Sequence, residues 1–301
     1  MPFKPTRHAS APEFVQPQRV FGYNEGKNLH RPPPTSENMS DVFDEIFSLI
    51  TPERLLHDPR ASGEGVAVCL IDSGVERSVL EAKFGAGMKR IEGAIFTADR
   101  AQPLPYEGKQ STPHGTTVAD ILLTQAPAVQ LYSADVFGPS GTCEVETVIK
   151  ALRWAYDVWK CKIVNLSLGV TEQKLQQLPK RQHLLRAIEE GYFKDVLIVA
   201  AAHNDHPFTR SYPAMFAPPI LSVDKGLFEN PLDFAYEPRD QIEFQAHGRG
   251  YLGPFAMEPA TSWAAPHLSG IAARLLSLRP ELKPFEVKTL LYWLFKSRQG
   301  K

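Results

Sequence analysis

Two polar residues in the first half of the chain, Asp72 and His114, have the side chains of an orienting acid and a general base. Asp72 follows the apolar run 66–71 and precedes a Ser-Gly turn, where a carboxylate can orient another group; an ordinary Asx turn fits the same residues. His114 lies between Pro113 and Gly115 at the start of a predicted helix. Its pKa near neutrality suits proton transfer, although a histidine in a loop is often only structural.

Two further residues in the second half, Asn204 and Ser262, suit a site at which negative charge develops. Asn204 follows the apolar run 196–202 and can present its amide as a hydrogen-bond donor to an oxyanion; a turn-forming asparagine is the alternative. Ser262 opens a predicted helix, where unpaired backbone N–H groups and the helix dipole favour an anion. A helix-capping serine, with Pro266 in the first turn, explains the same pattern.

The elements that must position these residues follow from hydrophobic periodicity. Apolar runs predict buried strands at 66–71, 129–136, 162–168 and 196–202, and helical spacing is found at 144–159, around Leu184 and Ile188, at 264–278 and at 284–296. Strands that alternate with helices predict an α/β fold of three layers, with a mostly parallel central sheet and helices on both faces. Sites in such folds lie beyond the carboxyl ends of the strands, so we expect all four residues to share one cleft.

Composition excludes several classes of partner. Lys plus Arg number 33 and Asp plus Glu 34, a net charge of -1, which argues against nucleic acid as a partner. No apolar run approaches the roughly 18 residues of a membrane span, so we expect no membrane partner. Three cysteines do not suggest a disulfide framework, and the first residues show no apolar core of a secretory signal. These features predict a cytoplasmic protein.

Two segments of different character divide the chain. Residues 1–40 are rich in proline and basic residues without sustained periodicity, and we expect an extended or disordered arm. A short amphipathic helix is expected from Asp41, and 41–301 is predicted to form the catalytic domain. The arm segment 14–23 carries apolar residues at intervals around Pro17, which suggests that it occupies the cleft and restrains activity; a tail without effect or a docking arm is the alternative.

The motifs together resemble those of the subtilisin-like serine peptidases, the subtilases. The resemblance rests on IDSGV at 71–75, HGTTVA at 114–119, VNLSLG at 164–169, AAAHN at 200–204 and ATSWAAPHLSG at 260–270, and it covers about residues 50 to 300. It implies a subtilisin-like fold and hydrolysis of peptide bonds. In that pattern Ser262 is the nucleophile, His114 its base, Asp72 the residue that orients His114, and Asn204 the oxyanion donor.

The resemblance also implies how a peptide or protein substrate binds. Ser167, Leu168 and Gly169 resemble the edge against which the family lays an extended peptide, and Gly141 belongs to the opposite wall. Ser211 falls where the family builds the floor of its specificity pocket. No cofactor is expected, and the sequence shows no metal-ligand pattern, although the family often binds calcium through backbone oxygens that a sequence does not reveal.

Three residues depart from the family pattern. His203 stands where the family usually has glycine, Ala260 replaces the glycine before Thr-Ser, and Trp263 replaces the methionine after the nucleophile. These departures bear on efficiency and substrate size. A dedicated processing peptidase with one partner protein or peptide precursor is an alternative to a general endopeptidase. A pseudoenzyme that only binds peptides is a second alternative, against which the four intact site residues argue.

Overall fold

The structure is a computed structural model, and it describes residues 48–138, 141–176, 178–253 and 257–299. Contacts divide the chain into two units, Met1–Asp41 and Val42–Lys301. The first unit, which holds the expected arm, lies outside the described residues, as does most of the helix expected from Asp41. The boundary between arm and catalytic domain therefore stays a prediction.

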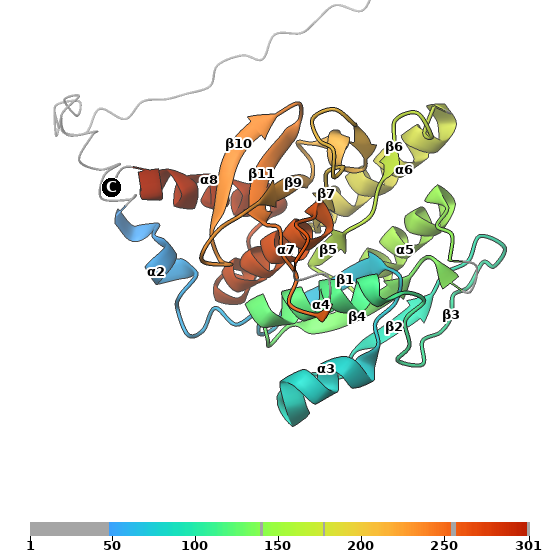
Figure 1. Ribbon diagram of the computed structural model, residues 1–301, viewed down its shortest axis with the longest axis horizontal. Helices are drawn as coiled ribbons and strands as arrows, with labels where there is room; N and C mark the ends of the chain where they lie inside the picture. The colour runs from blue at the N-terminus through green and yellow to red at the C-terminus, as the bar shows by residue number, and fades with distance from the viewer. Residues whose placement is uncertain (1–47, 139–140, 177, 254–256, 300–301) are drawn as a thin grey trace, which may run out of the picture. The chain divides into compact units, whose positions relative to one another are not determined.

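A single large sheet runs through the second unit (Figure 1). Within the described residues it has nine strands in the order β10-β11-β9-β7-β5-β1-β4-β2-β3. The six neighbouring pairs from β11 to β2 are parallel, and the two outermost pairs are antiparallel. The strands are β1 (Ala67–Asp72), β2 (Glu92–Ile95), β3 (Leu104–Pro105), β4 (Gln130–Asp135), β5 (Ile163–Leu166), β7 (Leu197–Ala201), β9 (Leu221–Gly226), β10 (Phe234–Arg239) and β11 (Ile242–His247).

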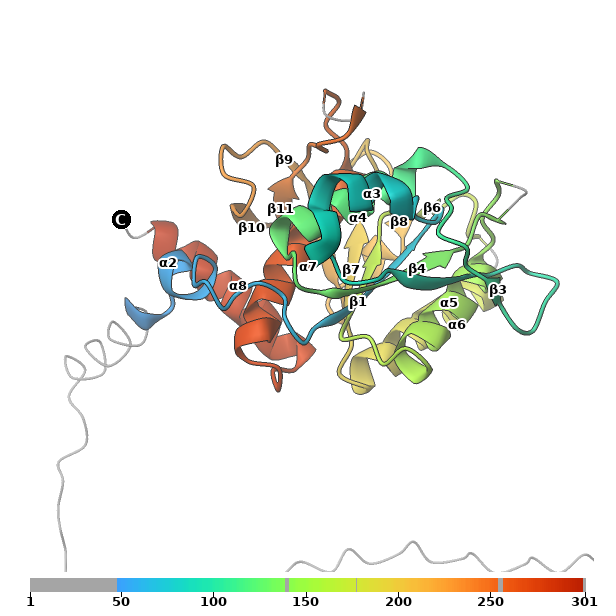
Figure 2. The same cartoon turned by 90° about the horizontal axis from the view of Figure 1, so that it is seen from below.

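Helices cover both faces of this sheet, which makes three layers. On one face α4 packs on β1, and α7 packs on β5, β7, β9 and β11; on the other face α5 contacts β1 and α6 contacts β7. Figure 2 shows α5 and α6 on one side of β1 and β4, with α3 and α4 on the other. The helices are α2 (Pro52–Leu55), α3 (Arg77–Phe84), α4 (Pro113–Gln125), α5 (Val145–Asp157), α6 (Leu178–Phe193), α7 (Thr261–Leu278) and α8 (Pro284–Gln299), with short 3₁₀ helices η1 (Gly85–Gly87) and η3 (Ala214–Phe216).

Each face of the sheet has its own hydrophobic core, because side chains alternate along a strand. In β1, Val68 and Leu70 belong to the core with α4 and α7, whereas Cys69 and Ile71 belong to the core with α5 and α6. Helix α7 is buried over most of its length and crosses α4 closely. A Cβ atom added to Gly270 of α7 would lie 2.4 Å from the Cβ of Gln125, so this crossing requires glycine.

The predicted architecture is confirmed: a mostly parallel sheet lies between two helical layers. The four strands expected from apolar runs correspond to β1, β4, β5 and β7, with ends that differ by one or two residues. A separate two-stranded antiparallel pair joins β6 (Val170–Thr171) to β8 (Ser211–Tyr212). Among the described residues, no helix is both long and apolar enough to cross a membrane.

Candidate active site

The end of β1 and the first turn of α4 bring a carboxylate and an imidazole together. Nδ1 of His114 lies 2.9 Å from Oδ1 and 3.0 Å from Oδ2 of Asp72. Asp72 is 2 % exposed, whereas about a third of the His114 side chain is exposed. Burial disfavours the charged form of His114, but the charge of Asp72 and its hydrogen bond outweigh burial, so the pKa of His114 lies above its usual value.

The turn after β1 fixes this pair at close range. The backbone N–H of Ser73 donates to Oδ1 of Asp72 at 2.7 Å, and the backbone N–H of Gly115 donates to Oγ of Ser73 at 3.1 Å. A Cβ atom added to Gly115 would lie 2.1 Å from the carbonyl oxygen of Gly74. Glycine at 115 therefore allows α4 to begin directly against the end of β1.

Ser262 is the second residue of α7, and its hydroxyl lies at the carboxyl end of β5. Its Oγ donates to the carbonyl oxygen of Ser167 at 3.3 Å, and Oγ of Ser167 donates to the carbonyl oxygen of Ser262 at 2.8 Å. Within the described part of the chain, the Ser262 hydroxyl makes no hydrogen bond to His114. Beneath this pair, Asn165 donates from Nδ2 to Oγ of Ser167 and accepts from Oγ of Ser269, each at 2.9 Å.

Asn204 is tied to the residue that precedes Ser262. Its Oδ1 accepts from the backbone N–H of Thr261 at 2.9 Å and from Oγ1 of Thr261 at 3.1 Å. Because the amide oxygen is engaged, its Nδ2 group is the part left to donate to another acceptor. The exposed Asn204 side chain is thus held beside the start of α7 in the orientation of a hydrogen-bond donor.

Two consecutive residues of β9 hold the turn that carries Asn204. Nζ of Lys225 donates to the carbonyl oxygen of Asn204 at 2.6 Å, and Oδ2 of Asp224 lies 3.0 Å from Nδ1 of the buried His206. The sequence reasoning missed both β9 residues, because no motif marks them.

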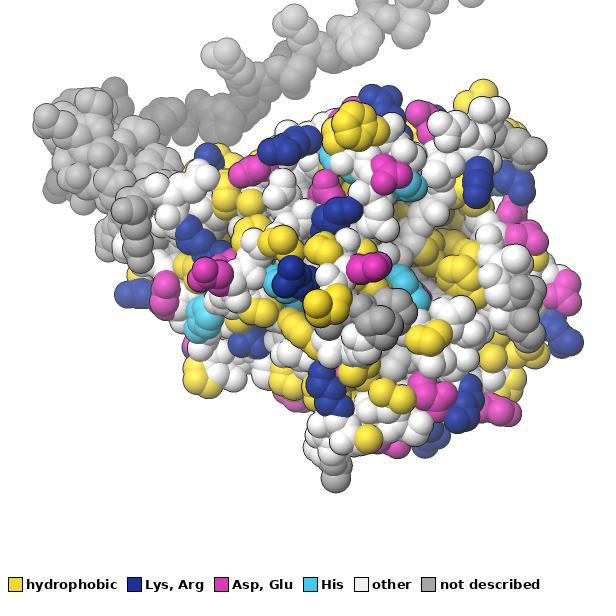
Figure 3. Space-filling model, in the orientation of Figure 1, with side chains coloured by type: hydrophobic (Ala, Val, Ile, Leu, Met, Phe, Trp, Pro, Cys, Tyr) yellow, Lys and Arg dark blue, Asp and Glu magenta, His cyan; other side chains and the backbone are white. Residues whose placement is uncertain are grey.

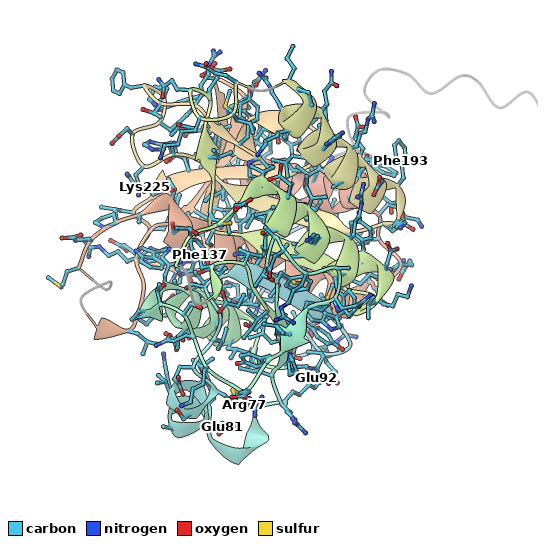
Figure 4. The ribbon with its side chains drawn as sticks, turned by 90° about the vertical axis from the view of Figure 1, so that its right-hand side faces the viewer. Arg77, Glu81, Glu92, Phe137, Phe193 and Lys225 are labelled. Atoms are coloured by element: carbon cyan, nitrogen blue, oxygen red, sulfur yellow. The ribbon has the colours of Figure 1, made fainter. Side chains whose placement is uncertain are left out.

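Lys225 and Phe137, which follows β4, lie toward the same side of the molecule, and Phe193 at the end of α6 lies opposite (Figure 4).

A cavity of about 410 Å³ opens beside these residues. Figure 3 shows a hollow on this face in which hydrophobic side chains gather. The lining residues are Phe137, Cys143, Glu144, Val145, Val148, Leu168, Gly169, Val170, Thr171, Lys174, Leu184, His203, Tyr212 and Pro213. Burial and the neighbouring carboxylates of Asp72, Asp135 and Glu144 raise the pKa of the Cys143 thiol to about 12, so the thiol is neutral.

The predicted substrate-binding residues fall at different places around this cavity. Leu168 and Gly169 line it, and Ser211 in β8 lies behind Gly169, since a Cβ atom at 169 would be 3.3 Å from its Oγ. Ser167 is buried under Ser262 and is not in the lining. Gly141 is exposed with a φ of 65° and is not in the described lining either.

The structure shows the surroundings of His203 and Ala260, two of the three departures from the family pattern. His203 lines the cavity, and its Nδ1 accepts from the backbone N–H of Asp205 at 3.1 Å. Ala260 precedes α7 with a φ of -140° and a ψ of 152°, an extended conformation that alanine adopts without strain. Glycine is therefore not required at 260.

Metal ligands were not expected, and this stays a prediction. In the described part of the chain, no group of three or more His, Cys, Asp or Glu side chains could hold a metal ion. One ring of backbone oxygens, in the loop after β2, contains an ammonium group. Nζ of Lys150 donates to the carbonyl oxygens of Thr97, Ala98 and Arg100 at 3.1, 2.8 and 2.9 Å.

Comparison with known proteins places this chain in a family. The model of the Subtilase family matches residues 63–225, more than half of the chain. Subtilisin DY from Bacillus licheniformis is 26% identical over 249 residues, which cover 76% of this chain and 83% of that protein. Subtilisin Savinase from Lederbergia lenta is 25% identical over 252 residues, with 78% and 85% covered.

Solved structures share the fold at lower identity. Sphericase matches with a TM-score of 0.59 and 22% identity, covering 79% of this chain and 86% of its own. A lanthipeptide protease matches with a TM-score of 0.59 and 20% identity, covering 84% and 87%. The chain belongs to the subtilase family and is a serine endopeptidase.

Proposed function

We propose that this endopeptidase cleaves peptide bonds with Ser262 as nucleophile, His114 as general base and acid, Asp72 as the residue that orients His114, and Asn204 as an oxyanion donor. The observation that carries the proposal is the contact of Nδ1 of His114 with the buried carboxylate of Asp72 at 2.9 Å. This contact leaves Nε2 of His114 to accept the serine proton.

The first chemical step begins with a turn of the Ser262 side chain. Its hydroxyl leaves the carbonyl oxygen of Ser167 and points to Nε2 of His114, which takes the proton as Oγ attacks the substrate carbonyl. The imidazolium that forms is stabilised by Asp72. His114 then gives the proton to the departing amine, and water, activated by the same imidazole, releases the acyl group from Ser262.

The oxyanion of the tetrahedral intermediate is stabilised by two donors. One is Nδ2 of Asn204, which is oriented because Thr261 engages the amide oxygen, and the other is the backbone N–H of Ser262. A donor of this kind acts on charge that exists only along the reaction path, so it raises kcat rather than substrate affinity.

The substrate-binding residues are proposed from the cavity and the turn beside it. Leu168 and Gly169 contact an extended peptide through their main chain, with Gly141 opposite, while Ser167 and Ser211 support this strip from below. Profiling cleavage of a peptide library tests this arrangement. Cleavage of many sequences supports a general endopeptidase, and cleavage confined to one sequence supports a processing peptidase.

Labelling with a fluorophosphonate probe tests the nucleophile. The folded protein is expected to react, and Ser262→Ala is expected to abolish both labelling and turnover. Ser277→Ala, which changes another serine of α7, is the matched control and should react like the unaltered protein. Labelling that survives in Ser262→Ala would show that the nucleophile is elsewhere, and failure of the folded unaltered protein to react would favour a peptide-binding pseudoenzyme.

The proposed reaction uses protein groups alone and needs no cofactor or metal. The Lys150 ammonium supports this in the loop after β2, because it satisfies carbonyl oxygens that would otherwise suit a cation. We expect a chelator to leave the melting temperature and kcat unchanged. A marked fall in melting temperature that calcium reverses would contradict the expectation.

The cytoplasm is the proposed compartment. All three cysteines are free, and burial together with the neighbouring Cys161 raises the pKa of the Cys69 thiol well above its usual range. Free thiols are typical of reducing compartments. Fractionation of cells that express the full chain tests this proposal, and recovery of the protein outside the cytoplasm would overturn it.

A further inference from the structure

The indole of Trp263 lies against the imidazole of His114. The centroids of the two rings are 5.0 Å apart, and the ring planes are inclined by 35°. Trp263 is 3 % exposed and belongs to the core between α4 and α7. Its Nε1 donates to the carbonyl oxygen of Glu258 at 3.2 Å, which fixes the rotation of the indole.

The surroundings of His114 divide into an edge and a face. Its Nδ1 edge meets Asp72, and its face meets the uncharged Trp263 of α7. From β4, Asp135 lies opposite Asp72 in the sheet register. The thiol of Cys143 interacts with these two carboxylates and with that of Glu144, and it is neutral because its pKa is about 12. The Asp72 carboxylate thus contacts the Nδ1 edge of the His114 ring, and Trp263 provides a π system beside the same ring.

We propose that Trp263 is a positioning residue of the active site, whose indole holds the plane of the His114 ring and stabilises the imidazolium formed when Ser262 loses its proton. This inference rests on the proposed role of His114. A cation within about 6 Å of an indole face is attracted by the ring quadrupole, and an aliphatic side chain lacks this attraction. Because the imidazolium forms during the reaction, the contact contributes to kcat.

Replacement of the indole should change the pKa of His114 and kcat in a defined direction. Loss of a cation–π contact makes the proton of the imidazolium easier to remove, so Trp263→Leu lowers the pKa of His114 by about 0.4 to 1.5 units. The acid limb of kcat/KM moves to lower pH by the same amount, and kcat falls by about twofold to thirtyfold. Trp263→Phe keeps a weaker π face, so its His114 pKa and its kcat should lie between those of Trp263→Leu and those of the unaltered protein.

Two measurements separate this role from simple packing. The first is the titration of the His114 imidazole by NMR, with and without Trp263→Leu, in the Ser262→Ala protein, which cannot digest itself. The second is tryptophan fluorescence, because a protonated imidazole in contact with an indole quenches it. We expect emission to fall as pH decreases through the pKa of His114, and we expect this step to be missing in His114→Gln and in Trp263→Leu.

Trp159→Leu is the matched control. Trp159 stacks on Tyr132 with ring centroids 5.1 Å apart and packs against the core on the other face of the sheet. Its replacement removes a tryptophan but should leave the His114 titration, the fluorescence step and the pH profile unchanged.

Folded Trp263→Leu with an unchanged His114 pKa and pH profile would overturn the inference. If Trp263→Leu does not fold, the inference is tested with Trp263→Phe and with the fluorescence of the unaltered chain. Tryptophan emission that shows no His114-dependent step would then overturn the inference. Turnover that survives in His114→Gln would instead reject the proposed role of His114, whatever the Trp263 variants do.

Discussion

Gly115→Ala perturbs the active site through one methyl group. The added Cβ would lie 2.1 Å from the carbonyl oxygen of Gly74 and 3.2 Å from Oδ1 of Asp72. Contacts this short require the start of α4 to retreat by about 1 Å from the end of β1. Because His114 is the preceding residue, its contact with Asp72 would lengthen from 2.9 Å to about 3.9 Å, beyond hydrogen-bond range.

The expected loss follows from that displacement. A misplacement of about 1 Å in a catalytic group costs about 10²-fold in rate, so kcat/KM should fall by this factor. Overpacking costs about 1–3 kcal/mol, which lowers the melting temperature by about 2–12 °C in a domain of this size.

The assay is hydrolysis of a fluorogenic peptide at a temperature at which the variant is fully folded, with thermal unfolding measured in parallel. Gly87→Ala is the matched control, because a Cβ atom added there meets nothing within 4 Å. Equal kcat/KM and melting temperature in Gly115→Ala and the unaltered protein would refute the close approach of α4 to β1.

Four other predictions concern the same site. Asn204→Ala should lower kcat by about 10²–10³, the size found when one such donor is removed from a related enzyme, with KM unchanged in steady-state kinetics; a change in KM alone would contradict the oxyanion role. Lys225→Met frees the Asn204 carbonyl and should lower kcat by about twofold to tenfold in the same assay, and an unchanged kcat would show that this anchor is dispensable. Activity should fall as pH decreases through the pKa of His114, which lies above its ordinary value of about 6.5, because only the neutral imidazole accepts the serine proton; a pH profile that is flat from 5 to 9 would contradict this. Deletion of residues 1–40 should raise kcat/KM if the arm occupies the cleft, and unchanged kinetics of the folded truncated protein would reject that role.

The central part of the fold could be predicted because its strands are rich in apolar residues. Strands β5 and β7 are buried throughout and β1 at all but its first residue, and their composition indicates this, whereas β4 alternates half-buried with buried residues in its first half. The outer strands were not predicted, for a physical reason. The end of β9 is half-buried, β10 ends in exposed residues, and β11 alternates buried with half-buried residues, so their pairing depends on neighbours supplied by the fold.

The residues of the candidate site also divide into those that a local sequence pattern marks and those that only the fold brings together. Asp72 and Asn204 could be found because each follows an apolar run, and His114 and Ser262 because each begins a predicted helix. The contact of Lys225 with Asn204 and the ring contact of Trp263 with His114 each join residues that are far apart in the chain. Contacts of that kind depend on the crossing of elements, which leaves no periodic trace in the sequence.

The place of α7 has a consequence for the order of events during synthesis. Ser262 belongs to the second-last helix, and that helix is buried against β5, β7, β9, β11 and α4. The ribosome therefore releases Asp72, His114 and Asn204 long before Ser262, the proposed nucleophile, and α7 can dock only on strands that have already assembled. Under the proposed mechanism an incomplete chain lacks its nucleophile and cannot cut itself or its neighbours, so hydrolytic capacity arises only when α7 has docked.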